Sequence, residues 1–141
     1  PKGVHEWVNR KFPSAKTWHQ ATVSLRNNIS HSAGCLRVDF RQYDFTLLAM
    51  KGKQLLLSQA FEYSTPEDVT YFLLKTCRQF ALSQNETKLE LSGLVDRQSA
   101  LYKELYQYFI HIEFRDAAWH SNHEHPAHFF TSLNELSKCV S

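Results

Sequence analysis

Apolar residues recur along the chain with two different periods, and each change of period marks a predicted element. Short alternating runs predict three successive strands. These strands are Cys35–Phe40, Phe45–Met50 and Leu55–Phe61. The connections between them are too short for a crossover, so neighbouring strands must run antiparallel. The pattern therefore predicts a three-stranded meander.

A helix over residues 66–82 is the best-marked element of the sequence. Thr65 offers a capping hydroxyl, Pro66 suits the first helical position, and carboxylates follow in the first turn. Apolar residues then recur at helical spacing and form one wide stripe. They are Val69, Phe72, Leu73, Cys77, Phe80 and Ala81. This stripe indicates a helix that packs against a sheet.

The remaining pattern alternates strands with helices. The predicted elements are a strand at Lys88–Leu94, a helix from Asp96 or Ser99 to about Phe109, a strand at His111–Phe114 and a helix after Pro126. From Cys35 onward the order is β-β-β-α-β-α-β-α. A meander followed by right-handed crossovers gives a mixed five-stranded sheet, order 3-2-1-4-5, with flanking helices. Ribonuclease H-like domains and each half of actin-like ATPases use this order, which identifies a fold and not an activity.

The segment before the first strand differs from this α/β unit. Its predicted elements are helices at Lys2–Phe12 and Ala21–Ile29, with an extended segment at Ala15–Gln20. Asn27–Gly34 carries the strongest loop signal in the chain. We therefore expect residues 1–33 to be the tail of a preceding lobe or an N-terminal extension, and residues 34–141 to form the α/β lobe. Because the chain begins at Pro1 without a methionine, we expect it to be part of a longer protein.

Composition excludes several classes of protein. With 16 basic and 14 acidic residues among 141, the net charge of +2 gives no electrostatic reason to expect nucleic acid or a membrane surface as partner. No apolar run is long enough to span a bilayer, so we expect no direct membrane insertion. Three widely spaced cysteines suit a reducing cytoplasm, which is the predicted location. The four glycines are too scattered for a phosphate-binding loop, which excludes P-loop and Rossmann proteins.

Three stretches of the chain resemble a known family. They read KQLLLSQAFEYSTPEDVTYFLLKTCRQF, LELSGLVDRQSALYKELYQYF and, near the end, LSKC. Together they resemble an uncharacterised bacterial family, domain of unknown function 3822, over roughly Phe12 to Cys139, with Gln59 where the family usually has Asn. That family is grouped with the actin-like ATPases, near the pilus-assembly actin-like proteins. The resemblance implies that this chain is the C-terminal half of a two-lobed molecule, whose partner is the N-terminal lobe of the same protein.

The resemblance also implies where a nucleotide would bind. Actin-like ATPases hold nucleotide between two lobes, at a glycine after an Asp that ends the first strand, and at a Gly-Gly turn after the fourth strand. The corresponding residues here are Asp39, followed by Phe40 and Arg41, and the single Gly93. The Phe40 side chain is expected to occupy the space where backbone amides would meet phosphate. These departures favour a degenerate, non-catalytic interaction or scaffold module, for which a further protein partner is also expected. An active ATPase using ATP and Mg²⁺ is the alternative.

A two-metal nuclease of the ribonuclease H-like type is a further alternative. Such enzymes hold two Mg²⁺ ions between carboxylates that clamp the attacking and leaving oxygens of a phosphodiester. Asp39, Glu67 or Asp68, and Asp96 fall in roughly suitable places, with Glu135 as a fourth candidate. Helix capping explains Glu67, Asp68 and Asp96 equally well.

A histidine-rich segment over residues 119–128 is the candidate metal site. His120, His123, His125 and His128 could offer imidazole nitrogens to Zn²⁺ or Ni²⁺. The segment lacks the His-x3-His spacing of a helical site, and a firm site needs ligands fixed by regular structure. Exposed loop histidines without a metal are the other interpretation.

Overall fold

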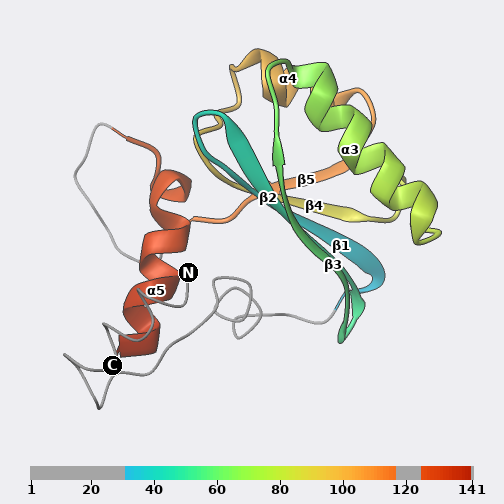
Figure 1. The fold of residues 1–141 in the computed structure, drawn as a ribbon, viewed down its shortest axis with the longest axis horizontal. Coiled ribbons are helices and arrows are strands. Elements are labelled where there is room, and N and C mark those ends of the chain that lie inside the picture. Colours follow the sequence, from blue (N-terminus) through green and yellow to red (C-terminus); the bar gives the residue numbers. More distant parts are fainter. Residues whose placement is uncertain (1–30, 117–124, 141) are drawn as a thin grey trace, which may run out of the picture.

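The computed structural model describes residues 31–116 and 125–140, which form a five-stranded sheet with helices against both faces (Figure 1). The strand order is β3-β2-β1-β4-β5. The first three strands pair antiparallel, whereas β1 with β4 and β4 with β5 pair parallel. The structure thus confirms the predicted mixed sheet of order 3-2-1-4-5.

Every strand and helix predicted from Cys35 onward is present in the described part of the chain. The strands are β1 (His31–Phe40), β2 (Asp44–Gly52), β3 (Gln54–Glu62), β4 (Lys88–Gly93) and β5 (His111–Phe114). The helices are α3 (Pro66–Gln79), α4 (Ala100–Tyr106), the 3-10 helix η1 (Ala127–Phe130) and α5 (Thr131–Val140). The predicted elements at residues 2–29 lie outside the described residues. The final helix thus begins with a separate 3-10 turn after Pro126.

The start of β1 corrects one prediction. Residues 31–34 were predicted to end a loop, but β1 begins at His31, which pairs with Gly52 of β2. The register shifts between His31 and Cys35, and Gly34 lies within this irregularity with φ of 109°. A glycine there adopts a backbone conformation that side chains disfavour. The Ser-Ala-Gly sequence therefore marks a bulge inside a strand rather than a loop.

The face of the sheet that carries α3 and α4 holds the hydrophobic core. Residues of β1, β2 and β4 alternate, so that every second side chain points to this face. The buried strand residues of the core are Leu36, Val38, Phe40, Phe45, Leu47, Ala49, Leu89 and Leu91. The buried helix residues of the core are Val69, Leu73, Cys77, Leu101 and Leu105. Most of the predicted apolar stripe of the first helix therefore covers the sheet, whereas Ala81 lies beyond the helix and is exposed.

Both ends of α3 have a structural cause. The Thr65 hydroxyl accepts from the Asp68 N–H, and the Asp68 carboxylate accepts the Thr65 N–H at 3.0 Å, which forms a capping box. The backbone N–H groups of Ser64 and Thr65, which both donate to this carboxylate, lower the pKa of Asp68. At the other end Ala81 has φ of 51°, and the Leu82 N–H donates to the Cys77 carbonyl at 2.8 Å. This left-handed closure stops the helix at Gln79, before the predicted residue 82.

The start of α4 distinguishes the two predicted caps. Ser99 is the N-cap, and its hydroxyl accepts from the Tyr102 N–H at 3.1 Å. The Asp96 carboxylate instead accepts the Gln98 N–H at 2.8 Å, within the preceding turn. Ser99 is therefore the correct cap and Asp96 is not. The regular helix ends at Tyr106, before the predicted Phe109, although the Phe109 N–H still donates to the Leu105 carbonyl.

Truncation of Leu73 tests this packing. Leu73 is fully buried in the core, and its neighbour Phe72 stacks on Phe61 with ring centroids 4.4 Å apart. We expect Leu73→Ala or Phe72→Ala to lower the free energy of unfolding by about 2–5 kcal/mol, because each leaves an unfilled cavity or a lost ring contact. Denaturant titration measures the change. The exposed Lys75→Ala is the control, with an expected effect within about 0.5 kcal/mol. Midpoints equal to that of the parent would contradict the helix-on-sheet arrangement.

Candidate functional site

The parallel pairing of β1 with β4 brings two distant predicted site residues together. The carboxyl ends of β1 and β4 lie side by side, where Asp39 pairs in register with Ser92 and Phe40 with Gly93. Ligands of open α/β sheets bind at the carboxyl ends of parallel strands. The predicted positions Asp39 and Gly93 therefore meet at the edge where a ligand site is expected.

A hollow lies at this edge, between the strand ends and the C-terminal helices. It has a volume of about 350 Å³. Its lining residues are Asp39, Phe40, Arg41, Gly93 and Leu94 from the sheet side, and Phe129, Ser132 and Leu133 from η1 and α5. The three predicted nucleotide-binding candidates, Asp39, Arg41 and Gly93, thus line one hollow.

Gly93 is fixed by its contact with the β1 backbone. Its φ is 79°, and a Cβ at this position would lie 2.1 Å from the carbonyl oxygen of Phe40. The next residue, Leu94, donates its N–H to the same carbonyl at 2.9 Å. Glycine is therefore required here for close approach of two backbones, whether or not a ligand binds.

The polar groups around Asp39 already have partners within the chain. The half-buried Asp39 carboxylate accepts the Ser92 hydroxyl at 2.8 Å. In the turn that follows, the Arg41 N–H donates to the Asp44 carbonyl at 2.9 Å. The Arg41 guanidinium pairs with the Asp44 carboxylate and donates to the Thr46 hydroxyl at 3.0 Å. The turn after β1 is thus closed by its own hydrogen bonds.

The ring of Phe40 lies elsewhere than expected. It was expected to fill the space for phosphate, but it is buried in the core. Its centroid is 5.7 Å from the ring of Phe45 and 6.0 Å from that of Tyr63. The period of the strand explains this, because residues 36, 38 and 40 share the apolar face. The Phe40 ring therefore does not fill the hollow. This turn differs from a glycine-containing turn in its backbone.

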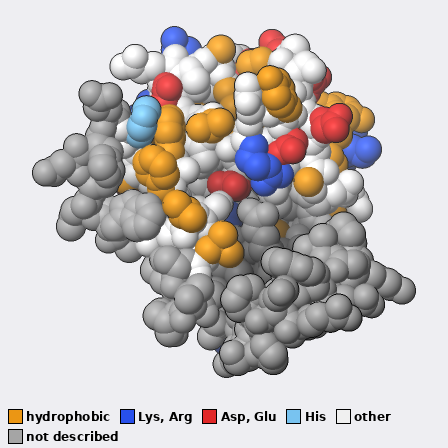
Figure 2. Space-filling model, turned by 60° about the vertical axis from the view of Figure 1, so that its left-hand side comes forward, with side chains coloured by type: hydrophobic (Ala, Val, Ile, Leu, Met, Phe, Trp, Pro, Cys, Tyr) orange, Lys and Arg blue, Asp and Glu red, His pale blue; other side chains and the backbone are white. Residues whose placement is uncertain are grey.

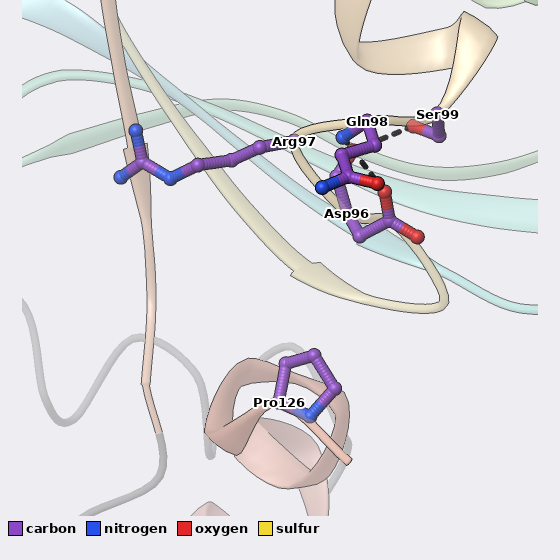
Figure 3. A pocket seen from close by; sticks show the side chains of 5 residues that line it. All are labelled: Asp96, Arg97, Gln98, Ser99 and Pro126. Atoms are coloured by element: carbon purple, nitrogen blue, oxygen red, sulfur yellow. Dashed lines mark hydrogen bonds between the residues drawn. The ribbon is translucent and has the colours of Figure 1, made fainter. Parts of the chain in front are cut away.

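A second hollow lies beside the turn that follows β4 (Figure 3). It has a volume of about 440 Å³ and is lined by Asp96, Arg97, Gln98, Ser99 and Pro126. Figure 3 shows Asp96, Gln98 and Ser99 together in one turn, while the Arg97 side chain extends away from them. The Arg97 guanidinium lies over the Phe114 ring, 5.3 Å from its centroid. The polar groups of this turn are thus engaged in local contacts.

The remaining acidic candidates for a two-metal site also have structural partners. Glu67 is exposed in the first turn of α3, and Asp68 belongs to the capping box. Asp96 accepts a backbone N–H in its turn, and Glu135 of α5 pairs with Arg115. Within residues 31–116 and 125–140, no three side chains of His, Cys, Asp or Glu are grouped so as to hold a metal ion.

The histidine-rich segment is only partly within the described residues. His120 and His123 lie outside them. His125 is exposed, with its ring 6.1 Å from that of Phe129. His128 is buried in η1, where its ring lies 4.2 Å from that of Phe114 and its Nε2 contacts the Val95 carbonyl. His128 is therefore a packed residue of a helix and not an exposed loop histidine.

The face of the sheet opposite the core carries a buried ionic cluster that sequence reasoning missed. Glu90 of β4 lies at its centre, with Oε2 at 2.9 Å from Arg37 Nε and 3.6 Å from Arg115 Nε. Lys88 Nζ lies 3.4 Å from the other oxygen of Glu90. Arg115 also pairs with Glu135, which links α5 to the sheet. The cluster thus holds in place the helix whose residues line the hollow at Asp39.

The environment of this cluster shifts the pKa values of Glu90 and Arg115. Burial raises the pKa of Glu90, but Arg37, Arg115 and Lys88 together bring it below its usual value. Burial and the nearby Arg37 lower the pKa of Arg115 to about 10, against the opposing effect of Glu90 and Asp39. A sequence signal for this cluster was present. Central strands covered on both faces are normally apolar throughout, whereas β1 and β4 carry Arg37 and Glu90 between apolar residues, so these two charges had to be buried together.

The surface in Figure 2 has no area of a single charge sign on its described part. Acidic and basic side chains lie interspersed there, with hydrophobic side chains between them.

Leu94 and Leu133, which line the hollow, are each more than half exposed. Among the described residues, none of the helices has the length and apolar character needed to cross a membrane.

The mixed sheet with helices on both faces places this chain among proteins of the actin-like ATPase fold, and solved structures share it. One is a Bacteroides thetaiotaomicron protein described as having an actin-like ATPase fold and unknown function, with 22% identity and a TM-score of 0.72 over 98% of this chain and 51% of that one. Another is an AlfA filament bound to AMPPNP, with 16% identity and a TM-score of 0.53 over 84% of this chain and 42% of that one. This chain spans about half the length of the first structure and less of the second.

Residues 1–112 match the family described as "protein of unknown function (DUF3822)", and the chain belongs to that family. This confirms the resemblance seen in the sequence for its first two stretches, whereas the third stretch, LSKC, lies beyond the matched residues. No curated protein matches the chain.

Proposed function

We propose that this chain is a non-catalytic lobe of the actin-like ATPase fold that serves as an interaction or scaffold module. The observation that carries the proposal is the closed state of the turn after β1. Its Arg41 N–H donates to Asp44, and the Asp39 carboxylate is bound by Ser92. A phosphate-binding turn needs backbone N–H groups that are free to point at the ligand.

The glycine content of the site supports the same conclusion. The turn after β1 contains no glycine between Asp39 and Asp44. At Gly93 the Phe40 backbone occupies the space that a side chain would need. The absence of a side chain there therefore leaves no room for a ligand. Backbone approach to a nucleotide would therefore require both turns to rearrange.

A second lobe of the same protein is the proposed first partner. The chain spans about half the length of the Bacteroides thetaiotaomicron protein, which supports a molecule with another lobe of similar size. The exposed Leu94 and Leu133 beside the hollow offer apolar area for such a contact. Nucleic acid is not proposed as a partner, and the net charge of +2 and the interspersed charges on the face seen in Figure 2 support that choice. The proposed location is the cytoplasm.

Nucleotide binding between two lobes is the second candidate function. It is favoured by the hollow of about 350 Å³ that Asp39, Arg41 and Gly93 line together. In this alternative Asp39 would face the Mg²⁺-bound phosphates of ATP, and Arg41 would supply positive charge. The solved AlfA filament was bound to AMPPNP, a fact about that protein which gives the alternative its ligand class.

Calorimetric titration with ATP and Mg²⁺ separates the two functions. We expect no saturable heat with the 141-residue chain or with a longer form of the protein, because the Arg41 and Leu94 N–H groups and the Asp39 carboxylate are engaged. The Asp39→Ala and Asp96→Ala variants are the matched pair, since Asp96 lies in the other hollow. Saturable binding that Asp39→Ala removes and Asp96→Ala leaves intact would overturn the non-catalytic proposal.

A further inference from the structure

The outer edge of β3 is an exposed strand edge in the described part of the chain. Within residues 31–116 and 125–140, β3 ends the sheet and pairs only with β2. Ala49 pairs with Leu57 and Met50 with Leu55, so Leu56 is an extra residue that interrupts the ladder. The segment from Leu57 to Glu62 is regular. An edge of this kind presents unpaired N–H and C=O groups to another strand.

The hydrogen-bond pattern identifies the groups that point outward. The Tyr63 N–H donates to the Tyr43 carbonyl at 3.0 Å, which makes this a hydrogen-bonded pair. Such pairs alternate along an antiparallel ladder, so residues 61, 59 and 57 also bond to β2. The backbone groups of Ser58, Ala60 and Glu62 therefore face away from the sheet.

This edge lacks the usual protection against strand pairing. Residues 57–61 (Leu-Ser-Gln-Ala-Phe) contain no charge and no proline. The opposite edge strand, β5, has only four residues and carries exposed His111 and Glu113. Short edge strands and charged side chains are the common means of preventing edge-to-edge association. The sheet is thus protected at one edge and open at the other.

An aromatic row runs from the core to the surface beside the open edge. The ring of Phe45 lies 5.5 Å from that of Phe61, which stacks on Phe72 at 4.4 Å. Phe72 lies 5.5 Å from Tyr71, whose side chain is 59% exposed. Exposed tyrosines on a rigid element are typical of protein interfaces. The face of α3 next to β3 therefore adds side-chain area to the backbone edge.

We infer that β3 pairs antiparallel with β3 of a second copy of this chain, about a two-fold axis at Gln59. This register pairs Ser58 with Ala60 of the second copy, so that outward backbone groups bond to each other. It also places Leu57 opposite Phe61, and two apolar side chains meet on the face toward α3. A two-fold contact of one surface with itself closes as a dimer. The inference rests on the proposed interaction role and names a partner for it.

A cysteine at the axis tests the register directly. In this arrangement Gln59 faces Gln59 as a non-hydrogen-bonded pair, with a Cα separation of about 4.5 Å, which a disulfide can bridge. We expect Gln59→Cys, in a Cys139→Ser background, to form a covalent dimer under mild oxidation at least about tenfold faster than Glu62→Cys. Glu62 lies three residues from the axis, which separates its two copies by about 20 Å. Equal rates for the two variants would overturn the register.

Edge variants test the association itself. Ala60→Pro removes an outward N–H without removing a bond to β2, and Ser58→Lys adds a charge at the junction. We expect either variant to weaken the dimer at least about tenfold in sedimentation velocity, and the control Ser58→Ala to leave it unchanged. Circular dichroism establishes that each variant is folded. If Ala60→Pro does not fold, Ser58→Lys decides the result.

The outcomes separate this inference from the proposed function. A parent chain that stays monomeric at all concentrations, or forms larger oligomers, overturns the two-fold pairing. So does a dimer that neither Ala60→Pro nor Ser58→Lys weakens. Saturable binding of ATP and Mg²⁺ would instead count against the non-catalytic role alone. A dimer weakened by both variants, with selective Gln59→Cys cross-linking, supports the inference.

Discussion

Replacement of Gly93 by alanine is expected to destabilise the lobe by more than about 3 kcal/mol. Two effects combine at this position. The φ of 79° disfavours any side chain, and the new Cβ would lie 2.1 Å from the Phe40 carbonyl oxygen, a distance at which the two backbones must separate. Separation would break the Leu94 to Phe40 hydrogen bond. Chemical denaturation of the purified variant measures the loss, and failure to fold is the extreme form of the same result.

Gly52 provides a matched control for Gly93→Ala. It also has a positive φ, of 60°, but no atom lies within 4 Å of a Cβ built on it. Gly52→Ala should therefore lose only the conformational contribution, about 1 kcal/mol. Similar losses in the two variants would mean that backbone conformation alone matters, and would contradict the close approach of β4 to Phe40.

Replacement of Glu90 by glutamine is expected to destabilise the protein by about 3–5 kcal/mol at neutral pH. The substitution keeps the shape of the side chain but removes the carboxylate that Arg37 and Arg115 both contact in a buried environment. Burying positive charge without this counter-charge is the source of the loss. Unfolding titrations of the parent and the variant give the difference. A loss below about 1 kcal/mol would indicate that the cluster behaves as an exposed one.

The dependence on pH follows from the lowered pKa of Glu90. Its carboxyl has a lower pKa in the folded protein than its value of 4.5 in the unfolded chain. Ionised Glu90 therefore stabilises the fold above pH 4.5, and this contribution is lost as the pH falls through the folded-state pKa. The difference between parent and Glu90→Gln should shrink over the same acid range. The exposed Glu113→Gln, which removes the ion pair with Lys88, serves as the control with an expected loss below about 1 kcal/mol.

The topology could be predicted because it follows from local signals. Two short connections force the meander, and Pro66 with its neighbouring cap fixes the start of α3. The start of β1 could not be predicted in this way. Ser32, Ala33 and Gly34 have the composition of a loop, and only pairing with β2 shows that they belong to a bulged strand. Local composition cannot distinguish these cases, since a bulge and a loop both favour glycine.

Only the part of the candidate site that follows from the strand order could be predicted. Once β1 and β4 were placed as parallel neighbours, Asp39 and Gly93 had to lie close together. The contact of Arg115 with Glu135 depends on how α5 lies against the sheet, which no local pattern specifies. The same holds for His128, whose packing against Phe114 comes from η1 and not from a loop. Long-range contacts between elements of different type leave no periodic trace in the sequence.

Cys35 and Cys77, both buried, lie on opposite faces of the sheet. Cys77 belongs to the α3 side, whereas Cys35 precedes Arg37 on the side of the ionic cluster. Burial raises the pKa of Cys35 to about 12 and that of Cys77 to about 11, so both thiols are protonated and unreactive while they stay buried. Each thiol then becomes open to alkylation only when its own face of the sheet is uncovered. Pulsed thiol labelling, read by mass spectrometry, can therefore time the opening of the two faces separately.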